Sequence, residues 1–340
     1  MSNLKFFKGS FYVTFIGLAL ALFVGGSEGL IIAGILGILE VSLSFDNAIV
    51  NAKVLNEMSD TWRHRFVTWG MIIAVGGMRL LLPLLIVSVI TGISMYESLH
   101  LALYEPAAYK HALESAHVVV MGFGGSFLML VFLTYFVDVN KEVHWVHIIE
   151  QPLTYLGKIE AVQVAIVLGF SYGVYTILKT LPADHSLEFL IASIFGILTY
   201  IATDVIKVVL EFERTPMTTV KSGLASFIYL EILDSSFSFD GVLGAFAVTQ
   251  ESIIIAIGLG IGAMFVRSLT LLLVEKGTLT EYRFLEHGAF YAIGCLSFLM
   301  YFNTFTHIPE VLTGLIGAAF IITAFIHSYM INRTENRLNN

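Results

Sequence analysis

The chain has 340 residues, of which 57% are hydrophobic and 13% are charged, and its mean hydropathy is +0.84. Soluble globular domains contain about 45–50% apolar and about 25% charged residues, so this composition excludes a soluble domain and indicates a polytopic membrane protein. The formal net charge is -8, and the absence of a basic cluster argues against a nucleic-acid partner. The single cysteine, Cys295, excludes an intramolecular disulfide.

Apolar segments long enough to cross a bilayer follow one another along almost the whole chain. Runs bounded by charges, proline or glycine predict ten helices and leave no stretch for a soluble domain. They cover residues 11–26, 28–55, 66–93, 113–137, 160–180, 187–210, 222–248, 252–275, 286–305 and 308–331. The first run resembles a signal peptide but lacks an A-x-A cleavage pattern, so we interpret it as a spanning helix. We therefore expect an all-α polytopic membrane protein, with residues 1–340 forming a single transmembrane domain.

The distribution of Lys and Arg predicts the orientation of these helices. With a cytoplasmic N-terminus, 14 of the 18 basic residues fall in cytoplasmic segments, and only Lys110 and Lys179 fall in outer segments. The other two, Arg79 and Arg267, lie within predicted helices. Because basic residues accumulate on the cytoplasmic side of membrane proteins, this split predicts that both termini are cytoplasmic.

One acidic motif occurs twice in the chain. The first copy, residues 40–47, reads EVSLSFDN, and the second copy, residues 234–241, reads DSSFSFDG. Both copies lie in predicted spanning helices, where an ionised carboxylate near the centre costs about 2.5–3.5 kcal/mol on insertion scales. The four carboxylates concerned are Glu40, Asp46, Asp234 and Asp240. Their burial in two matched copies indicates a functional site.

The duplication extends into the helices that follow each motif. Arg79 and Arg267 occupy matching positions in the next pair of helices, and Glu114 and Glu286 begin the pair after that. The two glutamates have two interpretations: they attract cations to a gate, or they complement the dipole of a first helical turn.

Corresponding helices are five apart in the predicted order. Since five is odd, the halves formed by residues 11–180 and 187–331 have inverted topology. In folds of this kind the matched motifs meet near the membrane midplane. We therefore expect Asp46 and Asp240 to face each other and to form the centre of one composite site.

Helical geometry separates the acids of the first motif. Glu40 and Asp46 are six residues apart, which places them about 120° from each other around an ideal helix. The stripe that contains Glu40 also contains Ser44, Asn47 and Asn51. Two arrangements remain open: the acids act at successive positions on a path, or the motif is locally unwound in one or both copies. Serines that compete for backbone hydrogen bonds favour unwinding, as does Gly241 in the second copy.

The donor atoms of the motifs are oxygens. Carboxylates, the amide of Asn47 and the supporting hydroxyls of Ser44 and Ser238 suit Mn²⁺, Mg²⁺ or Ca²⁺ better than Zn²⁺ or Cu⁺. Neither motif contains Cys or His. Arg79 and Arg267 would balance the carboxylates when the ion has left. The alternative is that the acids and arginines only fasten the bundle.

The paired acidic motifs in an inverted-repeat membrane protein resemble the TerC family, within the LysE-type transporter group. The resemblance covers both repeats and most of the chain. It implies a multi-spanning protein of the bacterial cytoplasmic membrane, associated with tellurium resistance and, in several branches, with Mn²⁺ export. By motif match, it assigns metal binding to Glu40, Asp46, Asn47, Asp234 and Asp240. The second copy departs from the pattern, because Gly241 replaces the amide and Asp234 replaces the longer glutamate.

These observations favour a divalent metal transporter, with Mn²⁺ export preferred and protons as the candidate counter-ion. Two alternatives stay open. One is a membrane accessory protein that supplies metal to exported proteins or assists their assembly, and the other is an intramembrane aspartyl hydrolase. The chain has no Walker motif and lacks the G-x-G-D signature of intramembrane aspartyl proteases, so we expect a protein that is not an enzyme.

Overall fold

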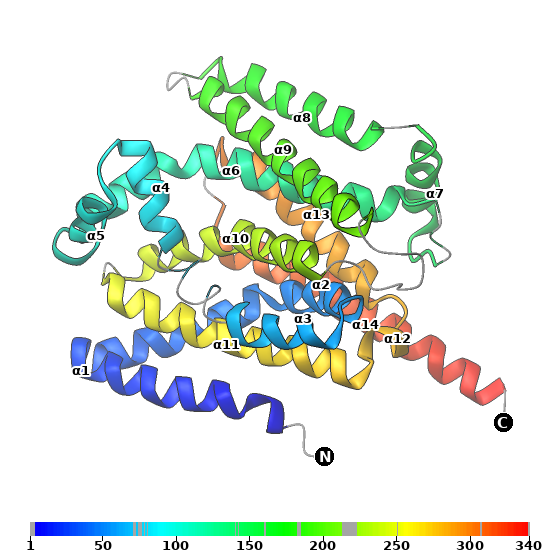
Figure 1. Cartoon of the computed structure of the whole chain (residues 1–340), viewed down its shortest axis with the longest axis horizontal. Helices are drawn as coiled ribbons and strands as arrows, with labels where there is room; N and C mark the ends of the chain where they lie inside the picture. The colour runs from blue at the N-terminus through cyan, green and yellow to red at the C-terminus, as the bar shows by residue number, and fades with distance from the viewer. Residues whose placement is uncertain are drawn as a thin grey trace. The chain divides into compact units, whose positions relative to one another are not determined.

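The chain is all-helical in the computed structural model, which describes residues 4–70, 73, 77, 79, 81–139, 141, 143–159, 161–181, 185–212, 223–249, 251–306 and 308–338 (Figure 1). These residues contain no strand. The α-helices are α1 (Leu4–Leu43), α2 (Phe45–Asn56), α3 (Asp60–Arg65), α4 (Leu82–Thr91), α5 (Met95–Tyr104), α6 (Pro106–Val137), α7 (His147–Leu156), α8 (Val162–Leu178), α9 (Ser186–Phe212), α10 (Gly223–Val248), α11 (Ser252–Lys276), α12 (Thr278–Glu281), α13 (Leu285–Asn303) and α14 (Glu310–Leu338). A π-helical turn, η1 (Phe66–Gly70), follows α3.

Several of these helices are long and apolar enough to cross a membrane. The described residues contain five such helices, within α1, α6, α9, α11 and α14, and α4 with α5 would make a sixth span that is bent by 112°. A polytopic membrane protein is therefore the architecture that the helices support. The bounds of α8 to α11 lie within a few residues of the predicted helices. The total of ten spans stays a prediction.

The helix α1 reverses direction at Gly26. This residue has φ 62° and ψ -154°, which are not helical values and which glycine adopts without a steric penalty. Ala21 before the turn and Ala33 after it belong to one apolar cluster with Ile254 of α11. α1 is thus a hairpin of two helical arms, as Figure 1 shows. The predicted boundary between the first two apolar segments is confirmed.

The chain divides into two compact units. Unit 1 consists of residues 1–117, 210–276 and 309–311, and unit 2 consists of residues 118–209, 277–308 and 312–340. Each unit therefore combines segments from both predicted repeat halves. Unit 1 contains both acidic motifs together with both matched arginines, Arg79 and Arg267.

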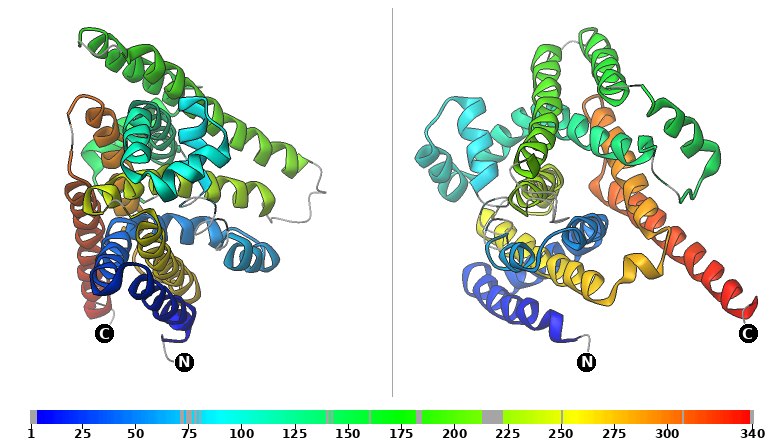
Figure 2. Two further views of the ribbon diagram at one scale, coloured as in Figure 1. Left: turned by 90° about the vertical axis from the view of Figure 1, so that its left-hand side faces the viewer. Right: turned by 45° about the vertical axis from the view of Figure 1, so that its right-hand side comes forward.

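Small residues bring α1 and α11 of unit 1 close together (Figures 1 and 2). A side-chain carbon at Gly258 would lie 2.6 Å from Cβ of Leu36, and one at Gly262 would lie 2.4 Å from Cβ and Cγ of Glu40. Helix pairs in membranes commonly use glycine at this spacing, because it lets the backbones approach. The G-x-x-x-G spacing of α11 therefore holds the stem of Glu40 against its backbone.

In unit 2, the loop between α6 and α7 is built around Glu150. The Glu150 carboxylate is fully buried and accepts hydrogen bonds from Lys141 Nζ at 3.1 Å, Val146 N at 3.0 Å and Tyr291 Oη at 3.1 Å. His144 Nδ1 lies 3.3 Å from the same carboxylate. Burial raises the pKa of Glu150, but the hydrogen bond from the Val146 backbone and the charge of Lys141 outweigh it, so the pKa lies below its ordinary value.

Replacing Glu150 by glutamine should destabilise unit 2, because Lys141 would lose its buried counter-charge. Breaking one partner of a buried ion pair costs about 3–5 kcal/mol. Thermal unfolding of the purified chain in detergent measures this loss.

The same variant should also change the acid sensitivity of unfolding. A lowered folded-state pKa means that the stabilisation by Glu150 is complete above its unfolded pKa and is lost as the pH falls through the folded-state value. The wild type should therefore lose more stability in acid than Glu150→Gln does. Equal losses in both proteins would contradict the assignment.

Candidate ion-binding site

The first acidic motif bends at a single residue, Ser44, which lies between the end of α1 and the start of α2. Ser44 has φ -101° and ψ 21°. Backbone hydrogen bonds continue on both sides of it, from Ser44 N to Glu40 O at 3.0 Å and from Ala48 N to Ser44 O at 3.3 Å. Local unwinding of the first motif is therefore limited to a one-residue bend.

The second motif lies in an unbroken helix, α10, which continues through Gly241. We expected Gly241 to favour local unwinding of this copy. That prediction is wrong, because the backbone stays helical through Gly241. The hydroxyls of Ser235 and Ser236 donate to the carbonyl of Ile232 at 2.6 Å and 3.1 Å. Both hydroxyls therefore share a carbonyl of the backbone ladder, and the helix nevertheless stays continuous.

Glu40 forms a buried ion pair with Arg79. Its Oε1 atom accepts hydrogen bonds from Arg79 Nη2 at 2.5 Å and from Ser44 Oγ at 3.0 Å, and the residue is 4% exposed. A side-chain carbon at Gly241 would lie 2.9 Å from Glu40 Oε2. The glycine that replaces the amide in the second motif therefore leaves room for the carboxylate of the first. An ion pair between a motif acid and a matched arginine, which the alternative interpretation of these residues requires, is thus present for Glu40.

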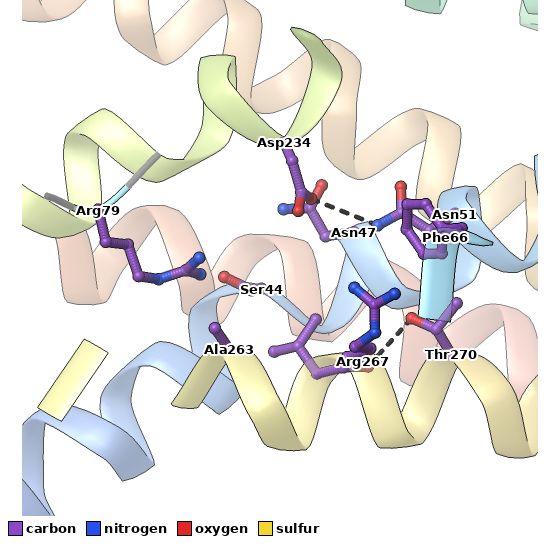
Figure 3. Close-up of a pocket in the computed structure, with 10 residues that line it drawn as sticks. Ser44, Asn47, Asn51, Phe66, Arg79, Asp234, Ala263, Arg267 and Thr270 are labelled. Carbon is purple, nitrogen blue, oxygen red and sulfur yellow. Dashed lines mark hydrogen bonds between the residues drawn. The ribbon is translucent and has the colours of Figure 1, made fainter. Parts of the chain in front are cut away.

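A small cavity lies beside this ion pair, and we call it the polar cavity (Figure 3). Its volume is about 20 Å³, and its lining residues are Ser44, Asn47, Asn51, Phe66, Arg79, Asp234, Ala263, Val266, Arg267 and Thr270. One water molecule needs about 10–15 Å³ by the same measure. The polar cavity therefore has room for one water or one bare ion, and not for an organic substrate.

The predicted stripe on the first motif forms one wall of the polar cavity. Ser44, Asn47 and Asn51 all line it, as their spacing predicts. Asn51 Nδ2 donates to Asp234 Oδ1 at 3.3 Å, so the helix that continues the first motif contacts the second motif here (Figure 3).

Several buried polar atoms near the polar cavity have no hydrogen-bond partner within the described part of the chain. They are Asn47 Oδ1, Asn51 Oδ1, both carboxylate oxygens of Glu231, and Nε and Nη2 of Arg267. Buried polar atoms are rarely left unsatisfied in proteins. The two amide oxygens therefore lack a donor or a cation, in a cavity that has room for one.

Glu231 was not among the predicted site residues. It lies one helical turn before Asp234 on α10 and is 7% exposed. A side-chain carbon at Gly70 would lie 2.8 Å from Glu231 Oε1 and 3.5 Å from Arg267 Nη1, so the glutamate and the arginine share one neighbourhood. At the offset of 194 its counterpart is Gly37, so a search for duplicated residues does not find it. The sequence signal that could have found Glu231 is its i,i+3 spacing from Asp234, which makes the two side chains neighbours on a helix.

Asp46 does not line the polar cavity. The residue is 6% exposed, and its Oδ1 atom accepts a hydrogen bond from the backbone N of Asn47 at 3.0 Å. The side chains of Ser238 and Asp240 lie outside the described residues. The pairing of Asp46 with Asp240 therefore stays a prediction. Among the described residues, no group of three or more His, Cys, Asp or Glu side chains is arranged to hold a metal ion.

The matched glutamates of the later helices differ in their positions. Glu286 lies in the first turn of α13, as the dipole interpretation predicts. Glu114 does not begin a helix, because α6 starts eight residues earlier at Pro106, and its exposed carboxylate lies 3.9 Å from Lys110 Nζ. The dipole interpretation is therefore wrong for Glu114.

The charged side chains of the polar cavity and of the first motif do not balance within the described part of the chain. Glu40, Asp46, Glu231, Arg79 and Arg267 are buried, and the carboxylate of Asp234 is half-buried. When all six are ionised, the carboxylates exceed the arginines by two charges. Because buried unbalanced charge is costly, one divalent cation or two protons would stabilise this group.

A family model described as "Protein of unknown function (DUF475)" matches residues 45–335, which is most of the chain. The matched range includes the whole second motif and the first motif from Phe45 onwards. No curated protein and no solved structure matches the chain.

Replacing Arg79 by methionine should destabilise unit 1 by about 3–5 kcal/mol, because Glu40 would stay buried without its counter-charge. Adding Glu40→Gln should recover most of this loss, since a neutral side chain needs no counter-charge. Unfolding midpoints of the wild type, both single variants and the double variant give the coupling energy of the pair. A double variant no more stable than Arg79→Met alone would contradict the pairing.

Proposed function

We propose that this chain, which belongs to the DUF475 family, transports a divalent cation across the bacterial cytoplasmic membrane, with Mn²⁺ export preferred. The observation that carries the proposal is the polar cavity, whose volume of about 20 Å³ suits one bare ion. Its wall presents two buried amide oxygens that lack a hydrogen-bond partner among the described residues. Hard cations such as Mn²⁺, Mg²⁺ and Ca²⁺ prefer such oxygen ligands.

The charge of the surrounding side chains supports a divalent cargo. The surplus of two negative charges among the four carboxylates and two arginines named above equals the charge of one such cation. Two protons would balance the same surplus, which makes protons the proposed counter-ion. The resemblance to the TerC family supports Mn²⁺ among the cations of this class.

The proposed ligands combine the cavity wall with the predicted motif residues. Asn47 and Asn51 offer amide oxygens, and Asp234 offers a carboxylate in the same cavity. Glu40, Asp46 and Asp240 are the further carboxylates of the site, with Ser44 and Ser238 as supporting hydroxyls. Arg79 and Arg267 would balance the acids after the cation leaves.

Transport requires that the site open to each side of the membrane in turn. We propose ten spans in two inverted repeats, with both termini in the cytoplasm and with one repeat rocking against the other. The presence of both motifs and both matched arginines in unit 1 supports this arrangement.

The polar cavity also weighs against the hydrolase alternative. A peptide bond with its flanking residues needs far more than the volume of one water molecule. Transport of an ion is therefore the better explanation of this geometry.

Flux measurements in liposomes test the proposal. The purified chain is reconstituted into liposomes that contain a Mn²⁺-sensitive dye. When Mn²⁺ is added outside the liposomes, transport should bring it inside, where it quenches the dye. Asp234→Asn should slow this flux by about tenfold or more, because changes around metal ligands commonly cost 10–100-fold in affinity or activity. Asp46→Asn and Asp240→Asn should slow the flux in the same way. If one of these variants keeps full flux, its residue is not a ligand in the proposed site.

Asp60→Asn is the matched control, because Asp60 lies on α3 of the same unit and its side chain is fully exposed. It should transport at the wild-type rate. If the folded wild-type protein transports none of the ions Mn²⁺, Mg²⁺ and Ca²⁺, the transporter hypothesis is refuted. The accessory role would then be the remaining alternative.

A further inference from the structure

Unit 1 contains a second and much larger cavity, which we call the apolar pocket. Its volume is about 480 Å³, within the range of about 300–1,000 Å³ that is common for sites that bind small organic molecules. Six helices contribute to its wall, namely α1, α4, α5, α6, α10 and α11. Representative lining residues from these helices are Leu20, Leu84, Leu103, Phe246 and Ile257.

The apolar pocket opens between side chains that face outwards. Ile16 and Leu20 of α1, Leu103 of α5 and Ile253 of α11 line it and are between 43% and 58% exposed. α1 and α11 are both long and apolar enough to cross a bilayer. In a membrane, these exposed apolar side chains face hydrocarbon, so an occupant would enter from the bilayer and not from water.

The helix α11 runs along both cavities and gives their order. It lines the apolar pocket from Ser252 to Ile261, which is about 13–14 Å of helix at 1.5 Å per residue. It then lines the polar cavity from Ala263 to Thr270. Arg79 lines both cavities and therefore marks the end of the apolar pocket opposite Ser252.

Polar groups in the apolar pocket are few. The charge of Arg79 is already balanced by Glu40, so this end does not require an anion. At the other end, Ser252 Oγ is buried and has no hydrogen-bond partner among the described residues. The pocket thus matches an uncharged hydrocarbon chain that has one hydrogen-bond acceptor at its Ser252 end. An empty apolar space of this size would lose the dispersion contacts of its walls.

We propose that the apolar pocket holds one acyl chain of a membrane phospholipid. The ester carbonyl of the lipid lies at Ser252, where it accepts a hydrogen bond from the hydroxyl. The end of the chain lies beside Arg79. In this position the acyl chain separates the polar cavity from the bilayer and supports the Glu40–Arg79 pair from its apolar side.

Photo-crosslinking with two phospholipids tests both the occupant and its direction. The full chain is placed in nanodiscs with phosphatidylcholine that carries a diazirine either near the ester or at the end of the acyl chain. Adducts are then mapped by peptide mass spectrometry. The probe near the ester should label Ile255, and the terminal probe should label Ile261 and Pro83.

These three residues are informative because they are buried, whereas outward-facing residues are labelled in any membrane protein. Labelling confined to exposed residues such as Ile31 would refute the proposal. The reverse order of labelling by the two probes would refute the assigned direction.

A variant that fills the apolar pocket provides the matched comparison. Ala256→Phe places a ring inside the pocket and should lose the adducts at Ile261 and Pro83. Ala19→Phe, at an exposed position of α1 that does not line the pocket, should keep them. If Ala256→Phe fails to fold, Ala102→Phe fills the pocket from α5. Undiminished labelling in a folded filling variant would overturn the proposal.

Discussion

The close contact between α1 and α11 determines where the charged groups of unit 1 lie. Gly258 and Gly262 have no side chains, so the second arm of α1 lies directly on the backbone of α11. The stem of Glu40 packs on α11, and its carboxylate accepts hydrogen bonds from Arg79 and Ser44. The ion pair, the polar cavity and the apolar pocket are all arranged along α11.

Much of the helical architecture follows from the order of apolar segments. The bounds of α8 to α11 and the reversal at Gly26 were predictable, because hydrophobic length and glycine are local signals. The stripe of Ser44, Asn47 and Asn51 was predictable for the same reason, since it depends only on 3.6 residues per turn. Duplication directed attention to both acidic segments and placed Asp46 and Asp240 at the centre of the site, whereas Asp234 is the described acid that lines the polar cavity.

The composition of the cavity wall could not be predicted, because it depends on which faces of three helices meet. Asp46 is buried and Asp234 is only half-buried, yet of the two only Asp234 lines the polar cavity. Glu231 has no counterpart in the first motif, so duplication concealed it. The substitutions in the second motif are also related to one another in space. Gly241 lies against Glu40, while the short Asp234 side chain is reached by Asn51.

The bend at Ser44 makes the two copies mechanically different. α10 is one unbroken helix, so the spacing between Glu231 and Asp234 is fixed by the helix itself. The first copy is divided at Ser44 into two helices, α1 and α2, and each of them packs on α11. The Glu40–Arg79 pair therefore belongs to one helix of the first copy, and the amides of Asn47 and Asn51 belong to the other. The oxygens around the polar cavity are thus supplied by separate helices, and Ser44 sets the angle between the two that carry the first copy.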